Sequence, residues 1–201
     1  MYKEIKTVKE QILEQIRFEI LSGQIKPGER LYEQKLADRF GVSRGPIRDV
    51  LQTLHHEGLL VYKSNGGMRV ADNLPPDLQN LIVDLRKRIE FFAIEKVLNN
   101  VDDKLLRKLE DILNDLKEAS EKNDYSTFAR KDMEFHKTIL EAYGSHILID
   151  IWAPLFLRKF LHYKKNGEFI ENYYEHKQIY EALKERNKEK LLKSLDKNIR
   201  F

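Results

Sequence analysis

The chain contains no cysteine, so disulfide bonds and thiolate metal sites are excluded, and any metal would need His, Asp or Glu ligands. It has no apolar run that approaches the roughly 20 residues of a membrane-spanning helix. Its first residues lack the apolar core of a signal peptide. We therefore expect a cytoplasmic protein with no membrane partner.

A strong charge of one sign is also missing. The chain has 36 basic and 33 acidic residues among 201, for a net charge of +3, so the molecule as a whole is no polyanion binder and any nucleic-acid site must be local. The hydrophobic content of 41% supports a real core, and the length allows one large or two small domains.

One segment, residues 31–58, has the pattern of a helix-turn-helix. A short helix with an apolar face ends at Phe40, Gly41 permits the positive φ of a tight turn, and Ser43 can cap the helix that follows. The apolar face of this second helix comprises Ile47, Val50, Leu51 and Leu54. An opening helix, with Val8, Ile12, Ile16 and Ile20 apolar, is expected to pack on this pair.

Arg44 and Arg48 lie one turn apart on the solvent face of the second helix, near its N-terminus. The helix dipole disfavours cations at that end, whereas phosphates and guanine edges would use them well. Gly45 would let the backbone approach DNA closely. A solvated charged face is the alternative, but five basic and two acidic residues between Arg30 and Arg48 favour DNA binding.

Two short apolar segments follow Gly58, at residues 59–62 and 68–70, and a glycine-rich loop at 63–67 joins them. This pattern predicts a β-hairpin that forms the wing of a winged helix-turn-helix domain, with residues 1–71 as the domain and 72–77 as a linker. Paired prolines, Pro75 and Pro76, would end the second strand and stiffen the linker.

The LADRFGVSRGPIR motif at residues 36–48, preceded by Pro-Gly-Glu-Arg at 27–30, closely resembles the N-terminal domain of GntR-family regulators. The resemblance runs from about residue 12 to residue 70 and implies contacts with an operator in double-stranded DNA. The DNA-contacting residues that it implies are Arg30, Arg44, Gly45, Arg48 and the wing tip Asn65, Gly66 and Gly67. Gly45 replaces the threonine or serine usual in the family, which bears on sequence preference.

Residues 78–201 are predicted to form an all-helical antiparallel bundle, so the protein is expected to be mainly α. The expected helices span about residues 78–99, 125–143, 145–163 (bent at Pro154), 169–186 and 188–199, and one more is capped by Asp102 or Asp103.

Three sparse motifs in this half resemble the FadR-type effector-binding (FCD) domain: Arg86-x-x-Ile89-Glu90, Asp132-x-x-Phe135-His136 and His176-x-x-Ile179. In metal-containing members, one Asp and three His residues bind a divalent ion. Asp132, His136 and His176 fall on three of these positions, and Asn198 occupies the fourth.

Asp132 and His136 stand one helical turn apart, so a carboxylate oxygen and an imidazole nitrogen can converge on one ion, with Zn or Ni the expected metals. His176 would come from another helix, and water or an effector could complete the shell because a carboxamide is a weak ligand. The alternative is an ordinary intrahelical hydrogen bond or ion pair between Asp132 and His136.

Arg86 has two interpretations. An arginine at this position in the resembled domain lies near the effector pocket, where a guanidinium suits a carboxylate. The alternative is a structural salt bridge with Glu90, one turn on.

These features together predict a transcription regulator, in particular a repressor, whose affinity for a pseudo-palindromic operator is controlled by a small carboxylate effector. A homodimer is expected, since two half-sites are related by two-fold symmetry. Two alternatives stay open: a hydrolase-like enzyme that uses a metal held by the Asp and His residues, and a constitutive dimeric DNA-binding protein without an effector.

Overall fold

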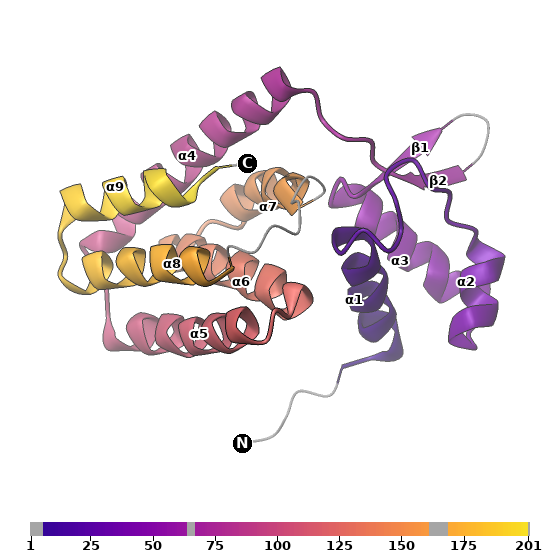
Figure 1. Cartoon of the computed structure of the whole chain (residues 1–201), viewed down its shortest axis with the longest axis horizontal. Coiled ribbons are helices and arrows are strands. Elements are labelled where there is room, and N and C mark those ends of the chain that lie inside the picture. Colours follow the sequence, from indigo (N-terminus) through magenta and orange to yellow (C-terminus); the bar gives the residue numbers. More distant parts are fainter. Residues whose placement is uncertain (1–5, 64–66, 161–168, 201) are drawn as a thin grey trace. The chain divides into compact units, whose positions relative to one another are not determined.

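The computed structural model describes residues 6–63, 67–160 and 169–200, which fall into two compact units, Met1–Asn73 and Leu74–Phe201. These described residues form nine helices and a two-stranded sheet, and the prediction of a mainly helical chain is confirmed (Figure 1). The elements of the first unit are α1 Val8–Leu21, α2 Glu33–Phe40, α3 Arg44–His56, β1 Leu60–Lys63 and β2 Gly67–Val70. Those of the second are α4 Pro76–Leu98, α5 Asp103–Glu121, α6 Tyr125–Tyr143, α7 His146–Phe160, α8 Phe169–Lys184 and α9 Lys188–Asn198.

In the first unit, α1 packs on α3, and α3 packs on α2 and β1. A capping box between Thr7 and Glu10 fixes the start of α1. The buried stripe of α1 comprises Ile12, Ile16 and Ile20, whereas Val8 is 59% exposed, so its expected place in the stripe is wrong. Val8 is the first residue of the helix.

The turn between α2 and α3 depends on Gly41, whose φ of 65° lies in the left-handed region, as predicted. Ser43 occupies the N-cap position of α3, but its side chain makes no capping hydrogen bond, so that expectation is wrong. All four residues of the predicted apolar face of α3 are buried.

The predicted wing hairpin forms from β1 and β2, which pair antiparallel with Leu60 opposite Val70. An isolated bridge between Arg30 and Arg69 attaches the preceding turn to the same sheet. Asn65 and Gly66, two of the expected wing-tip contacts, lie outside the described residues.

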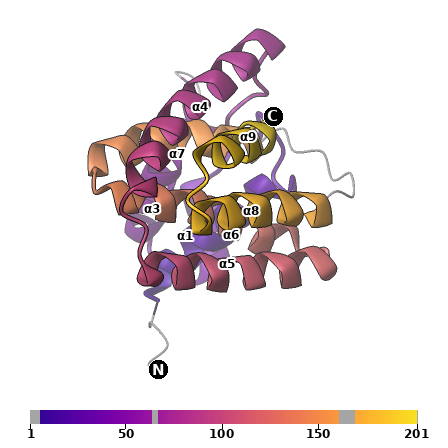
Figure 2. The same cartoon turned by 90° about the vertical axis from the view of Figure 1, so that its left-hand side faces the viewer.

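The helical second unit is the predicted bundle. α5 packs against α6 and α8, α8 against α9, and α4 against α6, α7 and α9 (Figure 2). Pro75 is the N-cap of α4 and Pro76 its first residue, so the helix starts before the expected position because proline is favoured there. Asp102 caps α5 by accepting a hydrogen bond from the Leu105 amide. The expected extension of α7 to Tyr163 lies outside the described residues.

The interior of the bundle is apolar around one polar cluster. Its largest buried side chains include Trp152, Phe128, Phe135 and Phe156. Trp152, Phe135 and Phe156 contact the charged and polar groups described below. Three apolar residues of α4 that the periodicity assigns to one helix face are instead 40–50% exposed: Leu81, Leu85 and Phe92. None of the described helices combines the length and hydrophobicity of a transmembrane segment.

Candidate DNA-binding surface and metal centre

Arg44 and Arg48 occupy the first two turns of α3, and each side chain is 57% exposed. Both bind the same carboxylate, that of Glu33 at the start of α2. Arg44 Nη2 donates to Glu33 Oε2 at 2.9 Å, while Arg48 donates through Nε and Nη2 to the two oxygens, each at 3.0 Å. Two of the three arginines expected to contact DNA are therefore neighbours on one surface, held by one acidic residue.

Two other expected DNA contacts, Arg30 and Gly67, line a hollow of about 380 Å³ between α2, α3 and the sheet, together with Arg44 and Arg48. Arg30 stacks on the Tyr32 ring, with its guanidinium carbon 4.6 Å from the ring centroid. Gly67 begins β2 with a φ of 77°.

Gly45 has no conformational need for glycine. It lies within α3 outside the left-handed region, and an added Cβ would meet nothing within 4 Å. Arg39, which contributes to the basic balance of the segment, pairs with Glu19 of α1 and thus ties α2 to α1.

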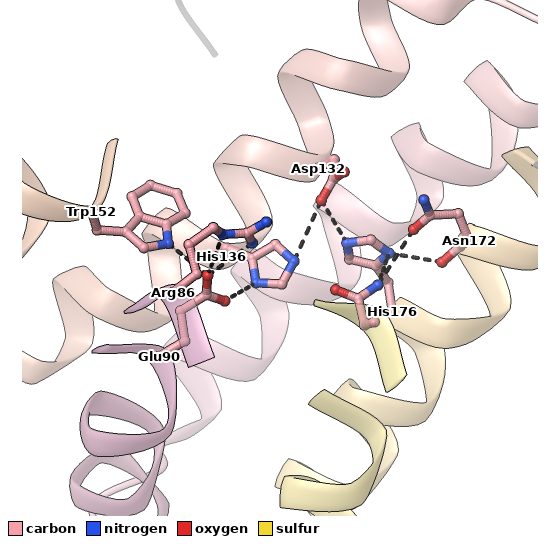
Figure 3. Close-up of polar contacts among 8 residues, drawn as sticks. Arg86, Glu90, Asp132, His136, Trp152, Asn172 and His176 are labelled. Carbon is pink, nitrogen blue, oxygen red and sulfur yellow. Dashed lines mark hydrogen bonds and ion pairs between the residues drawn. The ribbon is translucent and has the colours of Figure 1, made fainter. Parts of the chain in front are cut away.

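The second cluster lies inside the bundle and brings together Asp132, His136 and His176 (Figure 3). Asp132 and His136 come from α6 and His176 from α8. One ligand atom of each lies within 4.8 Å of the others, and all three side chains are almost completely buried. The structure thus brings three of the four expected metal ligands into one group.

The hydrogen bonds of His176 leave its Nε2 facing an acceptor. Its Nδ1 lies 2.8 Å from the Asn172 carbonyl oxygen, which can only accept, so Nδ1 carries the proton. In neutral His176, Nε2 then presents a lone pair to Asp132 Oδ1, 2.9 Å away. Two acceptors at this distance require a proton or a cation between them.

His136 is arranged in the same way. Its Nδ1 lies 2.7 Å from Glu90 Oε2, and its Nε2, which has no hydrogen-bond partner among the described residues, lies 3.4 Å from Asp132 Oδ1. Both imidazoles therefore direct Nε2 toward the same carboxylate oxygen, and each is oriented by a hydrogen-bond acceptor at Nδ1, as is usual for metal-binding histidines. The donor set of one carboxylate and two imidazoles fits a divalent Zn or Ni ion.

Glu90 and His136 shift each other's titration. Burial alone would raise the pKa of Glu90, but Arg86 and His136 outweigh it and lower the pKa to about 2. Burial alone would lower the pKa of His136, but Glu90 and Asp132 outweigh it and raise the pKa above its ordinary value. Without a metal, a proton on His136 is thus favoured.

Asn198, the fourth expected ligand, is buried beside His176 but meets it on the side of Nδ1, with Asn198 Nδ2 3.4 Å from that nitrogen. Its Oδ1 is buried without a hydrogen-bond partner among the described residues. The amide therefore adjoins the cluster, while its nitrogen lies at the opposite edge of the ring from Nε2.

Arg86 forms the salt bridge that the sequence offered as an alternative. Its Nε and Nη2 donate to Glu90 Oε1 at 3.0 and 2.8 Å, and Trp152 Nε1 donates to the same oxygen at 2.7 Å. The guanidinium also lies over the Phe156 ring, at 4.5 Å from the centroid. Arg86 Nη1 is buried and has no hydrogen-bond partner among the described residues.

Sequence reasoning missed the roles of Glu33, Asn172 and the second oxygen of Glu90. The role of Glu90 could have been predicted from its place in the Arg86 motif, because a buried carboxylate next to a single arginine can accept hydrogen bonds from further donors. No local signal marks Glu33, because its partners Arg44 and Arg48 lie on another helix. Asn172 acts through its backbone carbonyl, a group that every residue type has, so its side chain gives no signal either.

Two family models match the chain. The model described as "Bacterial regulatory proteins, gntR family" matches residues 8–70, and the model of the FCD domain matches residues 81–200. Together they cover both compact units.

Relatives match over most of their length. The gluconate operon transcriptional repressor of Bacillus licheniformis is 29% identical over 193 residues, which cover 92% of this chain and 79% of that protein. The transcriptional regulator McbR of Escherichia coli is 27% identical over 188 residues, 89% of this chain and 83% of that protein. The solved structure of E. coli McbR/YncC has a TM-score of 0.79 at 23% identity and covers 97% of this chain and 94% of that one. These relatives are transcription regulators and not enzymes, so they lend no support to the alternative of a hydrolase-like enzyme.

Proposed function

We propose, from the premise that this chain belongs to the GntR family of bacterial regulatory proteins and carries an FCD domain, that it is an operator-binding repressor controlled by a metal and a small acid. The observation that carries the proposal is the pairing of two sites in one chain: exposed arginines at the start of α3 and a buried Asp132, His136 and His176 cluster in the bundle. The repressor assignment follows the relatives that are named as repressors.

For the DNA-binding unit, we propose that α3 enters the major groove and that Arg44 and Arg48 contact base edges or adjacent phosphates. Arg30, Gly67 and the wing-tip residues Asn65 and Gly66 would contact the flanking backbone. Gly45 would let α3 approach DNA without a side chain in between, which agrees with the empty space around its Cα.

The proposed DNA contacts of α3 are tested with duplexes selected from a randomised pool. Arg44→Ala and Arg48→Ala should each weaken binding of the selected duplex by roughly 5- to 150-fold, since a good arginine–guanine pair contributes that much discrimination. Lys6→Ala, which removes a lysine from an exposed pair with Glu14, is the matched control for loss of one charge. Equal binding by wild type and both recognition-helix variants would refute the assignment of α3.

For the bundle, we propose that Asp132, His136 and His176 hold a divalent ion, Zn or Ni, and that Asn198 adjoins it. The ion would supply a Lewis acid that an effector's carboxylate can bind. The two histidines would hold it through Nε2, because Glu90 and the Asn172 carbonyl occupy their Nδ1 atoms.

We propose that the effector is a small carboxylate and that Arg86 Nη1 binds it. Arg86 is 1% exposed and its Nη1 is buried, so acid binding requires the side chains around it to move. Such a change inside the bundle can alter operator affinity only if the acid binds with different affinities to the DNA-bound and the DNA-free conformations of the regulator.

The effector is tested by thermal shift with gluconate, citrate and acetate on metal-loaded protein, gluconate being included because relatives are named for its operon. A binding acid should raise the melting temperature and change DNA affinity. Arg86→Lys, which retains a cation for Glu90 but lacks the forked guanidinium, should abolish both responses together. Full response in this variant would rule out Arg86. A regulator that binds its operator tightly with no response to metal or any acid would be the constitutive alternative.

We further propose a homodimer that joins through α4 and α7. Large apolar side chains are exposed on these two helices, which pack against each other. They are Leu78, Leu81, Leu85 and Phe92 on α4 and Ile147 and Ile151 on α7. The α4 residues repeat along one helix face, and a second copy with the same face would remove both from water. Leu85→Glu should shift the mass in solution from dimer to monomer, and a dimer that survives Leu85→Glu and Ile151→Glu would contradict this surface.

A further inference from the structure

Glu33 occupies a central position among the arginines of the DNA-binding unit. It is the first residue of α2, where the helix dipole favours a carboxylate. Its two oxygens accept three hydrogen bonds from Arg44 and Arg48, and the pair with Arg48 is bidentate. Hydrogen bonds from Arg48 and then Arg44 lower the pKa of Glu33 to about 2, so it stays ionised wherever DNA binding is measured.

Fold stability does not account for this arrangement. The arginine side chains are 57% exposed and Glu33 is 27% exposed, and ion pairs with that much access to water contribute little to folding. The helices α2 and α3 are held together by their apolar faces, in which Leu36, Ile47 and Leu51 are buried. The ion pairs lie outside this contact, on the rim of the hollow that also contains Arg30 and Tyr62.

The hydrogen bonds leave part of each guanidinium unused. Arg48 donates to Glu33 through one hydrogen on Nε and one on Nη2, so three of the five N–H groups of an arginine remain for another acceptor. Because the bidentate pair fixes the plane of the group, these remaining donors have a defined direction. The carboxylate also cancels one of the two positive charges that a phosphate would meet.

From this geometry we infer that Glu33 is a specificity-determining residue, which positions Arg44 and Arg48 for base edges and lowers the attraction of this surface for DNA of any sequence. The inference rests on the proposed function. Sequence-independent binding follows the number of phosphates neutralised, whereas base recognition requires a guanidinium in the correct plane. Glu33 weakens the sequence-independent attraction to phosphates and strengthens base recognition. Its net effect is therefore on the discrimination between specific and non-specific DNA.

The experiment compares two duplexes of equal length and composition, one selected from a randomised pool and one scrambled. Affinities are measured by fluorescence anisotropy over a series of salt concentrations for wild type, Glu33→Gln and Glu33→Asp. Glu14→Gln is the matched control, because it removes the same charge from an exposed pair between Glu14 of α1 and Lys6, which precedes α1. Melting temperatures show whether each variant is folded.

Glu33→Gln should bind the scrambled duplex more tightly, with a salt slope steeper by about 0.9, the value for one more neutralised phosphate. Its binding to the selected duplex should improve less or weaken, so the ratio of the two affinities falls by roughly fivefold or more. Glu33→Asp keeps the charge but is too short for both arginines, so the salt slope should stay at the wild-type value while the ratio still falls. Glu14→Gln should keep the wild-type ratio.

The inference is overturned if folded Glu33→Gln keeps the wild-type ratio, or if it loses affinity equally for both duplexes. If Glu33→Asp has the wild-type ratio, the positioning role is overturned, because the negative charge alone would then account for the discrimination between the two duplexes. A wild-type protein that does not discriminate between the duplexes would instead overturn the proposed function, so the two failures are distinct.

Discussion

Each unit of this regulator contains a glutamate that binds two cationic side chains, and the two sites differ chiefly in their access to water. Glu33 binds Arg44 and Arg48 on the surface of the first unit, where both arginines are more than half exposed. Glu90 binds Arg86 and His136 in the bundle, where every member is about 1% exposed. Water can replace the partners of Glu33, so its arginines can exchange a carboxylate for DNA. Nothing but another protein group or a ligand can replace the partners of Glu90.

This comparison is tested most severely by removing each glutamate in turn. Glu90→Ala should reduce the free energy of unfolding of the bundle by about 3–5 kcal/mol, because Arg86 would remain buried without a counter-charge. Glu33→Ala should change the free energy of unfolding by less than about 1 kcal/mol. Urea denaturation measures both by circular dichroism. The only tryptophan, Trp152, donates to Glu90 and so reports on the bundle by fluorescence.

Glu90→Gln is the control for the buried site, since it removes the charge but keeps acceptor capacity, and its loss of stability should be smaller. Equal and small effects of Glu33→Ala and Glu90→Ala would contradict the distinction between the two clusters.

The next largest effect concerns the metal. Removing one of the three proposed ligands by His176→Ala should weaken Zn or Ni binding by at least the roughly 10- to 100-fold that loss of an outer-sphere partner causes. Asn198→His should tighten it by adding an imidazole beside the cluster. Titration calorimetry with ZnCl₂ and NiCl₂ measures the affinities. Metal should also raise the melting temperature of the wild type, and EDTA should reverse the shift. If neither the wild type nor Asn198→His binds either ion, the cluster is purely structural.

A smaller effect follows from pH. Glu90 raises the pKa of His136, and this contributes stability to the metal-free bundle that is fully present below about pH 6.5 and is lost as pH rises through the raised pKa. Metal binding requires the deprotonated imidazole, so zinc affinity should increase over the same range. Melting curves between about pH 6 and 8 should therefore slope in opposite directions with EDTA and with excess zinc. Parallel slopes would contradict a metal that competes with the proton on His136.

The sequence predicts best what short-range chemistry determines. The 3.6-residue periodicity predicts the buried face of α3, and the position of Asp102 predicts the start of α5. The residues between Gly41 and Arg48 predict both the turn and the surface on which the arginines lie. These features depend on neighbours within one or two helical turns.

The remaining features depend on contacts that no local pattern encodes. Periodicity marks Leu81, Leu85 and Phe92 as apolar but cannot distinguish a core from a surface that another chain covers, and all three are exposed. Asp132 and His136 form a recognisable pair, whereas the approach of His176 from α8 was expected only from a family resemblance. No pattern distinguishes Glu33 from the other acid of its basic segment, although Glu33 binds both arginines in the first two turns of α3.

The smallest predicted effect is that of Gly45→Ala, which distinguishes a glycine required for folding from one required for DNA binding. Gly45→Ala should stabilise the first unit by about 0.5–1 kcal/mol or less, because the backbone is helical and an added Cβ meets empty space. If the backbone of α3 approaches DNA at this residue, the same variant should weaken binding of the selected duplex while its melting temperature rises. Opposite changes in stability and affinity would identify a glycine retained for DNA. Unchanged affinity would show that DNA does not reach this point of α3, and the arginines would then contact it from a greater distance.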